Sequence, residues 1–193
     1  MIYDKNIIAG KLRDWQRYFA SFTLPKWDEL PEIELYMDQV VALLEKYLDF
    51  FPHEEGERII TPVAINNYVR MRIMPAPVKK KYSRRHLAYL IMICTLKQSL
   101  SIAYISKMIP VRLEEDEVKK MYDEYVETHK AAELYFIDQV GKRGGALFNG
   151  EETGENVVFD LLTQLTAFSA FAKNLAEKVI ELPDEGEKQD DEE

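Results

Sequence analysis

Apolar residues recur at intervals of three and four along most of the chain, and this spacing is typical of amphipathic helices. The stretch from Asp4 to Phe22 shows it first, and the stretches from Glu114 to Val140 and from Asn156 to Ile180 show it over greater lengths. Only eight Gly and eight Pro residues are present, which disfavours turn-rich all-β folds. We therefore expect an all-α, mainly helical protein.

Capping residues and breakers divide the rest of the chain into shorter helices. Pro31 is well placed in the first turn of a second helix, and Thr61 followed by a proline predicts a third helix that runs to about Arg72. Ser83 and Ser101 can each begin a further short helix. The four glycines between Gly141 and Gly150 predict a loop or hinge.

These elements suggest three parts. Residues 1–112 are expected to hold the N-terminal helices and a DNA-binding head, and residues 113–182 a helical dimerisation or effector region. Residues 183–193 are almost all acidic and are predicted to be a disordered tail.

The basic residues are unevenly distributed although the net charge is −9. The stretch from Arg58 to Arg112 contains 11 of the 25 Lys and Arg residues and none of the 34 Asp and Glu residues. A local excess of positive charge attracts phosphates whatever the net charge of the chain. The stretch therefore predicts a nucleic-acid contact, with a solvated basic face as the competing interpretation.

The third predicted helix has two different sides. On a helical wheel, Ile65 and Tyr68 lie on the side expected to face the core, whereas Asn66, Asn67 and Arg70 lie on the other side. Asn pairs with adenine, and Arg pairs with guanine or phosphate. An exposed helix of this kind, followed by three lysines, is typical of a recognition helix with a basic wing.

The stretch from Ile60 to Ile109 resembles the winged helix-turn-helix of MerR-type regulators. The resemblance depends on Thr61-Pro62 at the helix start, Ile65 and Tyr68 within the helix, and Ile73-Met74-Pro75 after it. It continues with the positions of the next two helices, which are Tyr82-Ser83, Leu87, Leu90, Ile93, Leu96, Leu100-Ser101-Ile102 and Ile105.

The segment before this stretch resembles an uncharacterised bacterial family, the domain of unknown function DUF1836. The matching residues are Leu24 to Pro31 and Leu35 to Gln39. Together the two resemblances cover most of residues 20 to 110.

The MerR resemblance implies phosphate contacts from Tyr68 and from the wing, where Lys80 occupies a position usually held by arginine. Asn66 and Arg72 depart from that family's arginine and glycine. The resemblance also implies a homodimer formed through a long helix after the head, and the helix from Glu114 to Val140 is placed for it. Its spacing is not a clean heptad run, so a bundle within one chain, formed with the helix from Asn156 to Ile180, is the competing arrangement.

Motifs for catalysis or for a cofactor are not visible. The three histidines lack metal-ligand spacing, and Cys94, the single cysteine, belongs to the apolar side of its helix, where we expect it to be buried and inert. An aromatic set could line a ligand pocket, although such a set is usually core: Tyr135, Phe136, Phe148, Phe159, Phe168 and Phe171. We predict no enzymatic activity, no metal and no cofactor.

No secretory signal or membrane span is evident, and one cysteine fits a reducing compartment, so we expect a cytoplasmic protein that does not contact a membrane. We expect a transcription regulator that binds double-stranded DNA as a homodimer, with an unknown small-molecule effector. The predicted contact residues are Thr61, Asn66, Asn67, Tyr68, Arg70, Lys79, Lys80, Lys81, Tyr82, Arg84 and Arg85.

Two alternatives remain at this point. One is an adaptor whose basic patch docks an acidic partner, including the acidic tail of the chain itself. The other is a small-molecule enzyme.

Overall fold

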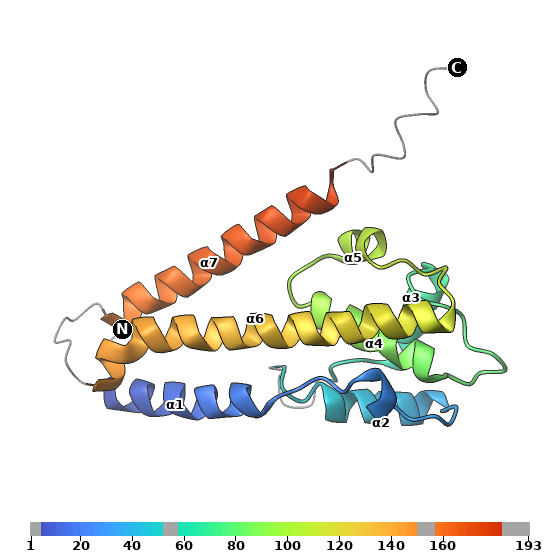
Figure 1. The fold of residues 1–193 in the computed structure, drawn as a ribbon, viewed down its shortest axis with the longest axis horizontal. Helices are drawn as coiled ribbons and strands as arrows, with labels where there is room; N and C mark the ends of the chain where they lie inside the picture. The colour runs from blue at the N-terminus through green and yellow to red at the C-terminus, as the bar shows by residue number, and fades with distance from the viewer. Residues whose placement is uncertain (1–4, 52–57, 150–156, 183–193) are drawn as a thin grey trace, which may run out of the picture.

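The computed structural model describes residues 5–51, 58–149 and 157–182, and within these ranges the protein is mainly helical, as the spacing predicts. The longest helix, α6 (Glu115–Asn149), runs the length of the molecule. Helix α1 (Lys5–Ser21) lies along its C-terminal half (Figure 1). The 3-10 helix η1 (Trp27–Glu29) contacts α6, and α2 (Met37–Tyr47) lies nearer the other end.

The remaining short helices gather at that other end. They are α3 (Pro62–Arg70), α4 (Arg84–Leu96) and α5 (Ile102–Met108). Helix α4 is the centre of the core, because every residue from His86 to Thr95 is buried. A helix buried on all sides needs neighbours all round it, and α2 and α6 are in contact with it.

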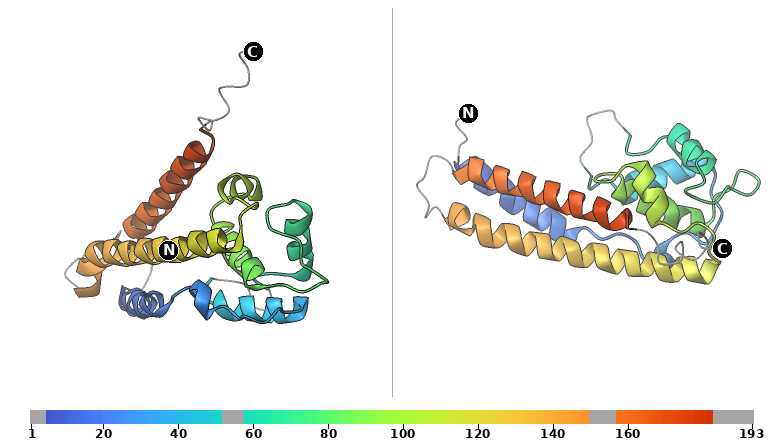
Figure 2. Two further views of the ribbon diagram at one scale, coloured as in Figure 1. Left: turned by 45° about the vertical axis from the view of Figure 1, so that its right-hand side comes forward. Right: turned by 90° about the horizontal axis from the view of Figure 1, so that it is seen from above.

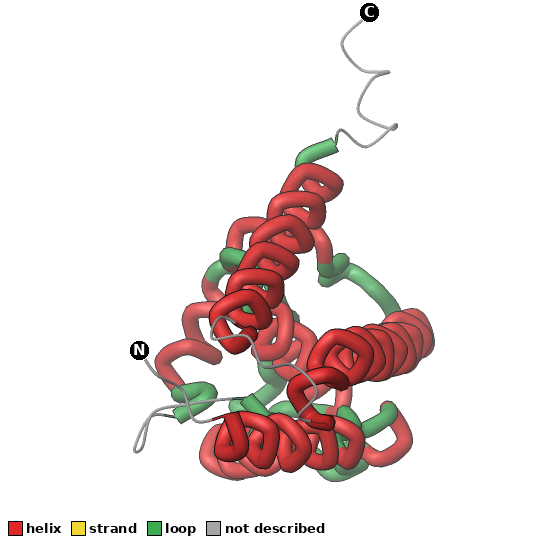
Figure 3. Tube along the Cα trace, turned by 90° about the vertical axis from the view of Figure 1, so that its left-hand side faces the viewer, coloured by secondary structure: helices red, strands yellow, loops and turns green. Residues whose placement is uncertain are grey.

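The last helix, α7 (Val157–Ile180), diverges from α6 along its length (Figures 1 and 2). Figure 3, which looks along the molecule, shows α1, α6 and α7 as three separate rods at the corners of a triangle. The C-terminal end of α7 rests on α5, where the Tyr104 hydroxyl donates a 2.7 Å hydrogen bond to Glu181.

The predicted start of the second helix is wrong. Helix α2 begins only at Met37, because Leu35 pairs with Tyr82 in an antiparallel bridge with hydrogen bonds of 2.9 and 2.8 Å. The Gln39 side chain then accepts the Tyr36 N–H at 2.9 Å and begins the helix. Pairing with a residue so far along the chain is invisible to a local pattern.

The predicted glycine hinge is also wrong, since α6 continues through Gly141 to Asn149. A Cβ atom at Gly141 would lie 3.1 Å from Nε2 of Gln16 in α1. The contact between α1 and α6 stabilises this part of α6, and packing of this kind outweighs the weak helix propensity of glycine. The predicted acidic tail, residues 183–193, lies outside the described residues.

Candidate nucleic-acid interface

Helix α3 begins where the sequence predicts and ends two residues earlier. The Thr61 hydroxyl accepts the Ala64 N–H at 3.2 Å, and Pro62 occupies the first helical position. The predicted sides of the helix are confirmed, since Ile65 is fully buried whereas Val63 is 69% exposed.

The exposed side of α3 carries an amide and a guanidinium that are already paired. Asn66 is exposed and Asn67 partly so. Nη2 of Arg70 donates to Oδ1 of Asn67 at 2.9 Å, one turn apart on the helix. This pair holds the arginine along the outer surface of α3 instead of letting it fold back onto the core.

A hairpin between α3 and α4 forms the wing, which we define as residues Val78 to Lys81. Val78 and Lys81 form an antiparallel bridge, and the Lys81 N–H donates to the Val78 carbonyl at 2.9 Å. Lys79 and Lys80 occupy the tip with φ of 49° and 63°. Positive φ at both central residues is the geometry of the type I′ hairpin turn, which normally takes Asn and Gly. The loop carrying this hairpin projects from the molecule beside α3 (Figure 2).

The wing is anchored at its base by two contacts. The bridge between Leu35 and Tyr82 ties the wing to the segment before α2. The ring of His86, on the first turn of α4, accepts the Ser83 N–H on Nδ1 at 3.0 Å and lies 3.1 Å from the Ala76 carbonyl through Nε2. A neutral imidazole with its proton on Nε2 satisfies both contacts, and burial lowers the pKa of His86.

Two arginines predicted to clamp phosphates are used inside the protein instead. Arg84 donates through Nε and Nη2 to the Leu30 carbonyl at 3.1 and 2.9 Å, with carboxylates of η1 and the following segment nearby. Arg85 donates to the Val111 carbonyl at 3.2 Å. Their side chains connect α4 to segments on either side of it, so neither is placed to reach DNA.

Two tyrosines of the predicted set are likewise core residues. Tyr82 is 2% exposed and Tyr68 is 6% exposed. Burial raises the pKa of Tyr68 to about 12. Tyr68 was predicted to contact DNA from the MerR resemblance, and Tyr82 as a member of the predicted contact set. Because both rings are buried in the core cluster, we leave them out of the proposed contact set.

Some cations of the basic stretch from Arg58 to Arg112 pair with carboxylates that lie elsewhere in the sequence. Lys81 lies 3.6 Å from a Glu34 carboxylate oxygen and 5.9 Å from the Tyr36 ring centre. Arg58 lies 3.6 Å from Glu45. The cations of α3 and the wing that form no ion pair with any described residue are Arg70, Arg72, Lys79 and Lys80.

The comparisons with known proteins point to one family. The family model DUF1836, described as a domain of unknown function, matches residues 25–125. The chain belongs to the DUF1836 family. No curated protein and no solved structure matches the chain. The MerR resemblance is therefore not supported by the comparisons and stays a prediction.

The DUF1836 region coincides with a packing unit. It spans η1 to the first part of α6, and this part of α6 closes the core with Val118, Tyr122 and Val126. The Tyr122 hydroxyl donates to the Pro25 carbonyl at 2.7 Å, and Asp123 accepts the Trp27 N–H at 2.9 Å. The boundary predicted after residue 112 falls in a loop inside this unit.

Two residues of the DUF1836 region contribute to the site although the sequence does not predict it. His86 stands three residues after Ser83, which is the spacing of a capping box, and this spacing could have predicted the hydrogen bond between them. Arg72 has a φ of 57° and lies exposed just after α3. Nothing in the local pattern indicates that α3 ends before it.

Other kinds of site find little support in the described ranges. Cys94 is fully buried as predicted, and burial raises the pKa of its thiol to about 12. Within residues 5–51, 58–149 and 157–182 there is no group of three His, Cys, Asp or Glu side chains suited to a metal ion. None of the helices in those ranges has the length and apolarity needed to cross a bilayer.

Proposed function

We propose that this DUF1836 protein is a transcription regulator that contacts duplex DNA with the exposed side of α3 and with the tip of the wing. The order of helix, wing and supporting helix agrees with the MerR-type resemblance. The contacting set is narrower than the sequence suggests: Thr61, Asn66, Asn67, Arg70, Arg72, Lys79 and Lys80. The proposal includes no catalytic step and no cofactor.

One observation carries the proposal, namely that two exposed lysines form the tip of a type I′ turn. Each non-glycine residue in the left-handed region costs about 1–2 kcal/mol. Such strain is typical of functional positions. A pair of lysines that projects from the surface at this cost is well suited to hold a phosphate on each side of the turn.

Helix α3 supplies the groups that can distinguish bases. Its exposed amides can pair with adenine, and Arg70, steadied by Asn67 at 2.9 Å, can pair with guanine or with a phosphate. Phosphate contacts position a protein on the duplex, and base contacts select the sequence. We therefore assign positioning to Arg70, Arg72 and the two wing lysines, and sequence selection to the exposed amides of α3.

The test measures binding to a fluorescent duplex by anisotropy at several salt concentrations. Four phosphate contacts per chain give a slope of about −3.6 for log K against log[salt], so affinity falls about 150-fold between 50 and 200 mM salt. The Lys79→Glu/Lys80→Glu variant is expected to halve the slope and to abolish retention in a gel shift. The control is Lys11→Glu/Lys142→Glu, which changes the charge equally on α1 and the distal half of α6.

Equal binding by the wing variant and the wild type at every salt concentration would refute the proposal. A selection of genomic fragments with the purified chain then gives the preferred sequence, and Asn66→Ala and Asn67→Ala are expected to relax it at single positions by about 1–3 kcal/mol.

The rival proposal is an adaptor that docks an acidic protein segment on the same cations. Its motivating observation is the contact of Tyr104 with Glu181, an acidic residue that lies beside α5 and precedes the predicted tail by two residues. Deleting residues 183–193 distinguishes the two: an unchanged DNA affinity argues against masking by the tail. Loss of DNA binding together with tight capture of an acidic peptide would favour the adaptor.

A further inference from the structure

Helix α7 exposes far more apolar surface than a helix of a monomer normally does. Phe168, Phe171, Leu175, Val179 and Leu182 are between 56% and 73% exposed. A contiguous patch of this kind marks an interaction site. The spacing of these residues along α7 and the cavity between α6 and α7 indicate which kind of partner covers them.

Seven apolar residues in and directly after α7 follow a seven-residue repeat. One series contains Leu165, Ala172 and Val179, and a second series, offset by three, contains Leu161, Phe168, Leu175 and Leu182. These are the a and d positions of a coiled coil, and none of them is charged. We call this set of seven residues the α7 seam.

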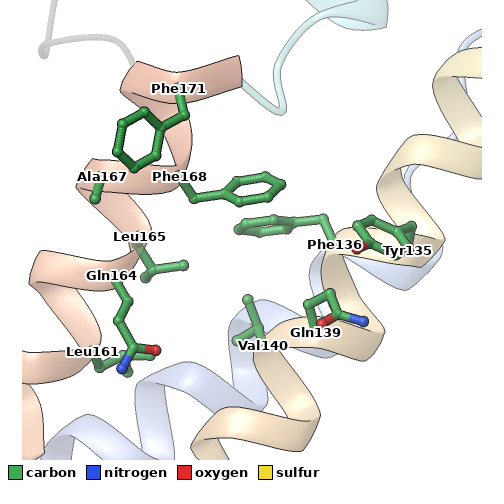
Figure 4. A pocket seen from close by; sticks show the side chains of 10 residues that line it. All are labelled: Tyr135, Phe136, Gln139, Val140, Leu161, Gln164, Leu165, Ala167, Phe168 and Phe171. Atoms are coloured by element: carbon green, nitrogen blue, oxygen red, sulfur yellow. The ribbon is translucent and has the colours of Figure 1, made fainter. Parts of the chain in front are cut away.

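The first part of the α7 seam is covered by α6, and the rest is open. Leu161 is buried and Leu165 partly buried where the two helices are close. Further along, the helices diverge (Figure 1). Leu175, Val179 and Leu182 are 65%, 57% and 68% exposed. The divergence leaves a cavity of about 330 Å³ between Tyr135, Phe136 and Val140 of α6 and Leu161, Phe168 and Phe171 of α7 (Figure 4).

The size of the open seam decides between two occupants. A cavity of 330 Å³ is at the small end of ligand pockets, and it ends at Phe171. A ligand filling it would leave Leu175, Val179 and Leu182 in water. A helix of 24 residues is about 36 Å long and could cover the whole seam.

We propose that the α7 seam binds the α7 seam of a second copy of this chain. A two-fold axis brings the same residues together from both copies, so one uncharged seam is complementary to itself. Five exposed side chains are available in each copy, namely Phe168, Leu175, Val179 and Leu182 of the seam, together with Phe171 beside it. Covering about 100 Å² on each of them in both copies buries about 1,000 Å² in total, which is the minimum for a specific interface. Exposed Tyr135 of α6, which lines the cavity, extends the apolar surface.

This proposal replaces α6 with α7 as the dimer helix. The MerR resemblance implies dimerisation through Glu114–Val140, with a bundle inside one chain as the competing arrangement. In the structure that helix contacts α1, α4, η1 and α7 of its own chain. The dimer proposal does not depend on DNA binding. A dimer would give the DNA-binding unit a partner for a second half-site.

The experiment is light scattering on the full chain during size-exclusion chromatography, without DNA. The wild type is expected at twice the chain mass of 22.6 kDa. Leu175→Glu places a charge in the seam and is expected to weaken association at least about 100-fold. The matched control is Asn174→Glu, which adds the same charge at an exposed neighbour outside the seam and is expected to stay dimeric. Circular dichroism establishes that both variants fold.

Three results would overturn the proposal. The first is a monomeric wild type at about 0.1 mM, a concentration at which even weak specific dimers form. The second is a Leu175→Glu variant that remains dimeric. The third is a monomer in which the fluorescent naphthalene probe anilinonaphthalene sulfonate binds the cavity stoichiometrically and raises Tm, which assigns the cavity to a ligand. Lys79→Glu/Lys80→Glu is expected to dimerise normally, so failure of the DNA proposal and failure of the dimer proposal give different results.

Discussion

Replacing the two wing lysines by Asn and Gly changes folding and binding in opposite directions. Lys79 and Lys80 have φ of 49° and 63°, and each costs about 1–2 kcal/mol relative to an unstrained residue. Asn-Gly is the preferred sequence of a type I′ turn. Glycine has more backbone freedom in the unfolded chain than lysine, and this offsets about 0.5–1 kcal/mol of the gain in stability. The Lys79→Asn/Lys80→Gly variant is therefore expected to be about 1–2 kcal/mol more stable, and its Tm about 2–8 °C higher.

The same change removes two phosphate contacts. Each contact contributes about 0.9 to the slope of log K against log[salt], so the pair contributes about 1.8. At 0.1 M salt this corresponds to a loss of about 60-fold in DNA affinity. A more stable protein that binds DNA less tightly is the expected outcome.

The assays are calorimetry for Tm and fluorescence anisotropy for DNA affinity. Lys79→Gln/Lys80→Gln is the matched control, because it removes the same charge without relieving the turn. It is expected to lose the same affinity and to gain no stability. If Asn-Gly is no more stable than Gln-Gln, the strain argument is wrong, and if either variant binds DNA as tightly as the wild type, the wing does not hold phosphate.

The remaining predictions concern the support of the wing and the core. Burial lowers the pKa of His86 below 6.5, so as the pH falls the unfolded chain takes up this proton before the folded protein does, and the stability of the fold decreases below about pH 6.5. Between pH 7 and pH 5 the Tm of His86→Gln should therefore fall less than the Tm of the wild type. An identical fall in both proteins would contradict this role of His86. Arg84→Lys keeps the charge but loses the two hydrogen bonds to the Leu30 carbonyl, so the free energy of unfolding in urea should fall by about 1–3 kcal/mol while DNA affinity stays unchanged. A variant of full stability that binds DNA less tightly would instead support a phosphate contact by Arg84. The Cys94 thiol, fully buried with its pKa raised to about 12, should react with a disulfide reagent only after unfolding, and rapid reaction of the native protein would show that the core opens.

Much of the helical fold could be predicted because helix formation depends mainly on residues that are close together in the sequence. The apolar spacing located α1, α6 and α7, and the Thr61-Pro62 pair located the start of α3. The sides of α3 followed from the same geometry, since Ile65 and Tyr68 are buried as the wheel indicates.

The candidate site was predicted only in part, because charge along a chain is not charge in space. Lys79 and Lys80 are exposed, but Lys81 lies beside Glu34 and Arg84 faces Leu30. These partners stand 47 and 54 residues away from them in the sequence. A composition count between Arg58 and Arg112 contains no information about them.

Local patterns in the sequence are sufficient to predict the helical fold, the buried side of α3 and the excess of positive charge that follows it, but not the exposure of Phe168 and Phe171. Three features are visible only in the folded protein: the type I′ turn at Lys79 and Lys80, the continuation of α6 through Gly141, and the opening between α6 and α7. The reason is the range of the interactions: periodicity and capping act over one helical turn, whereas these three features depend on segments that meet only after the chain has folded.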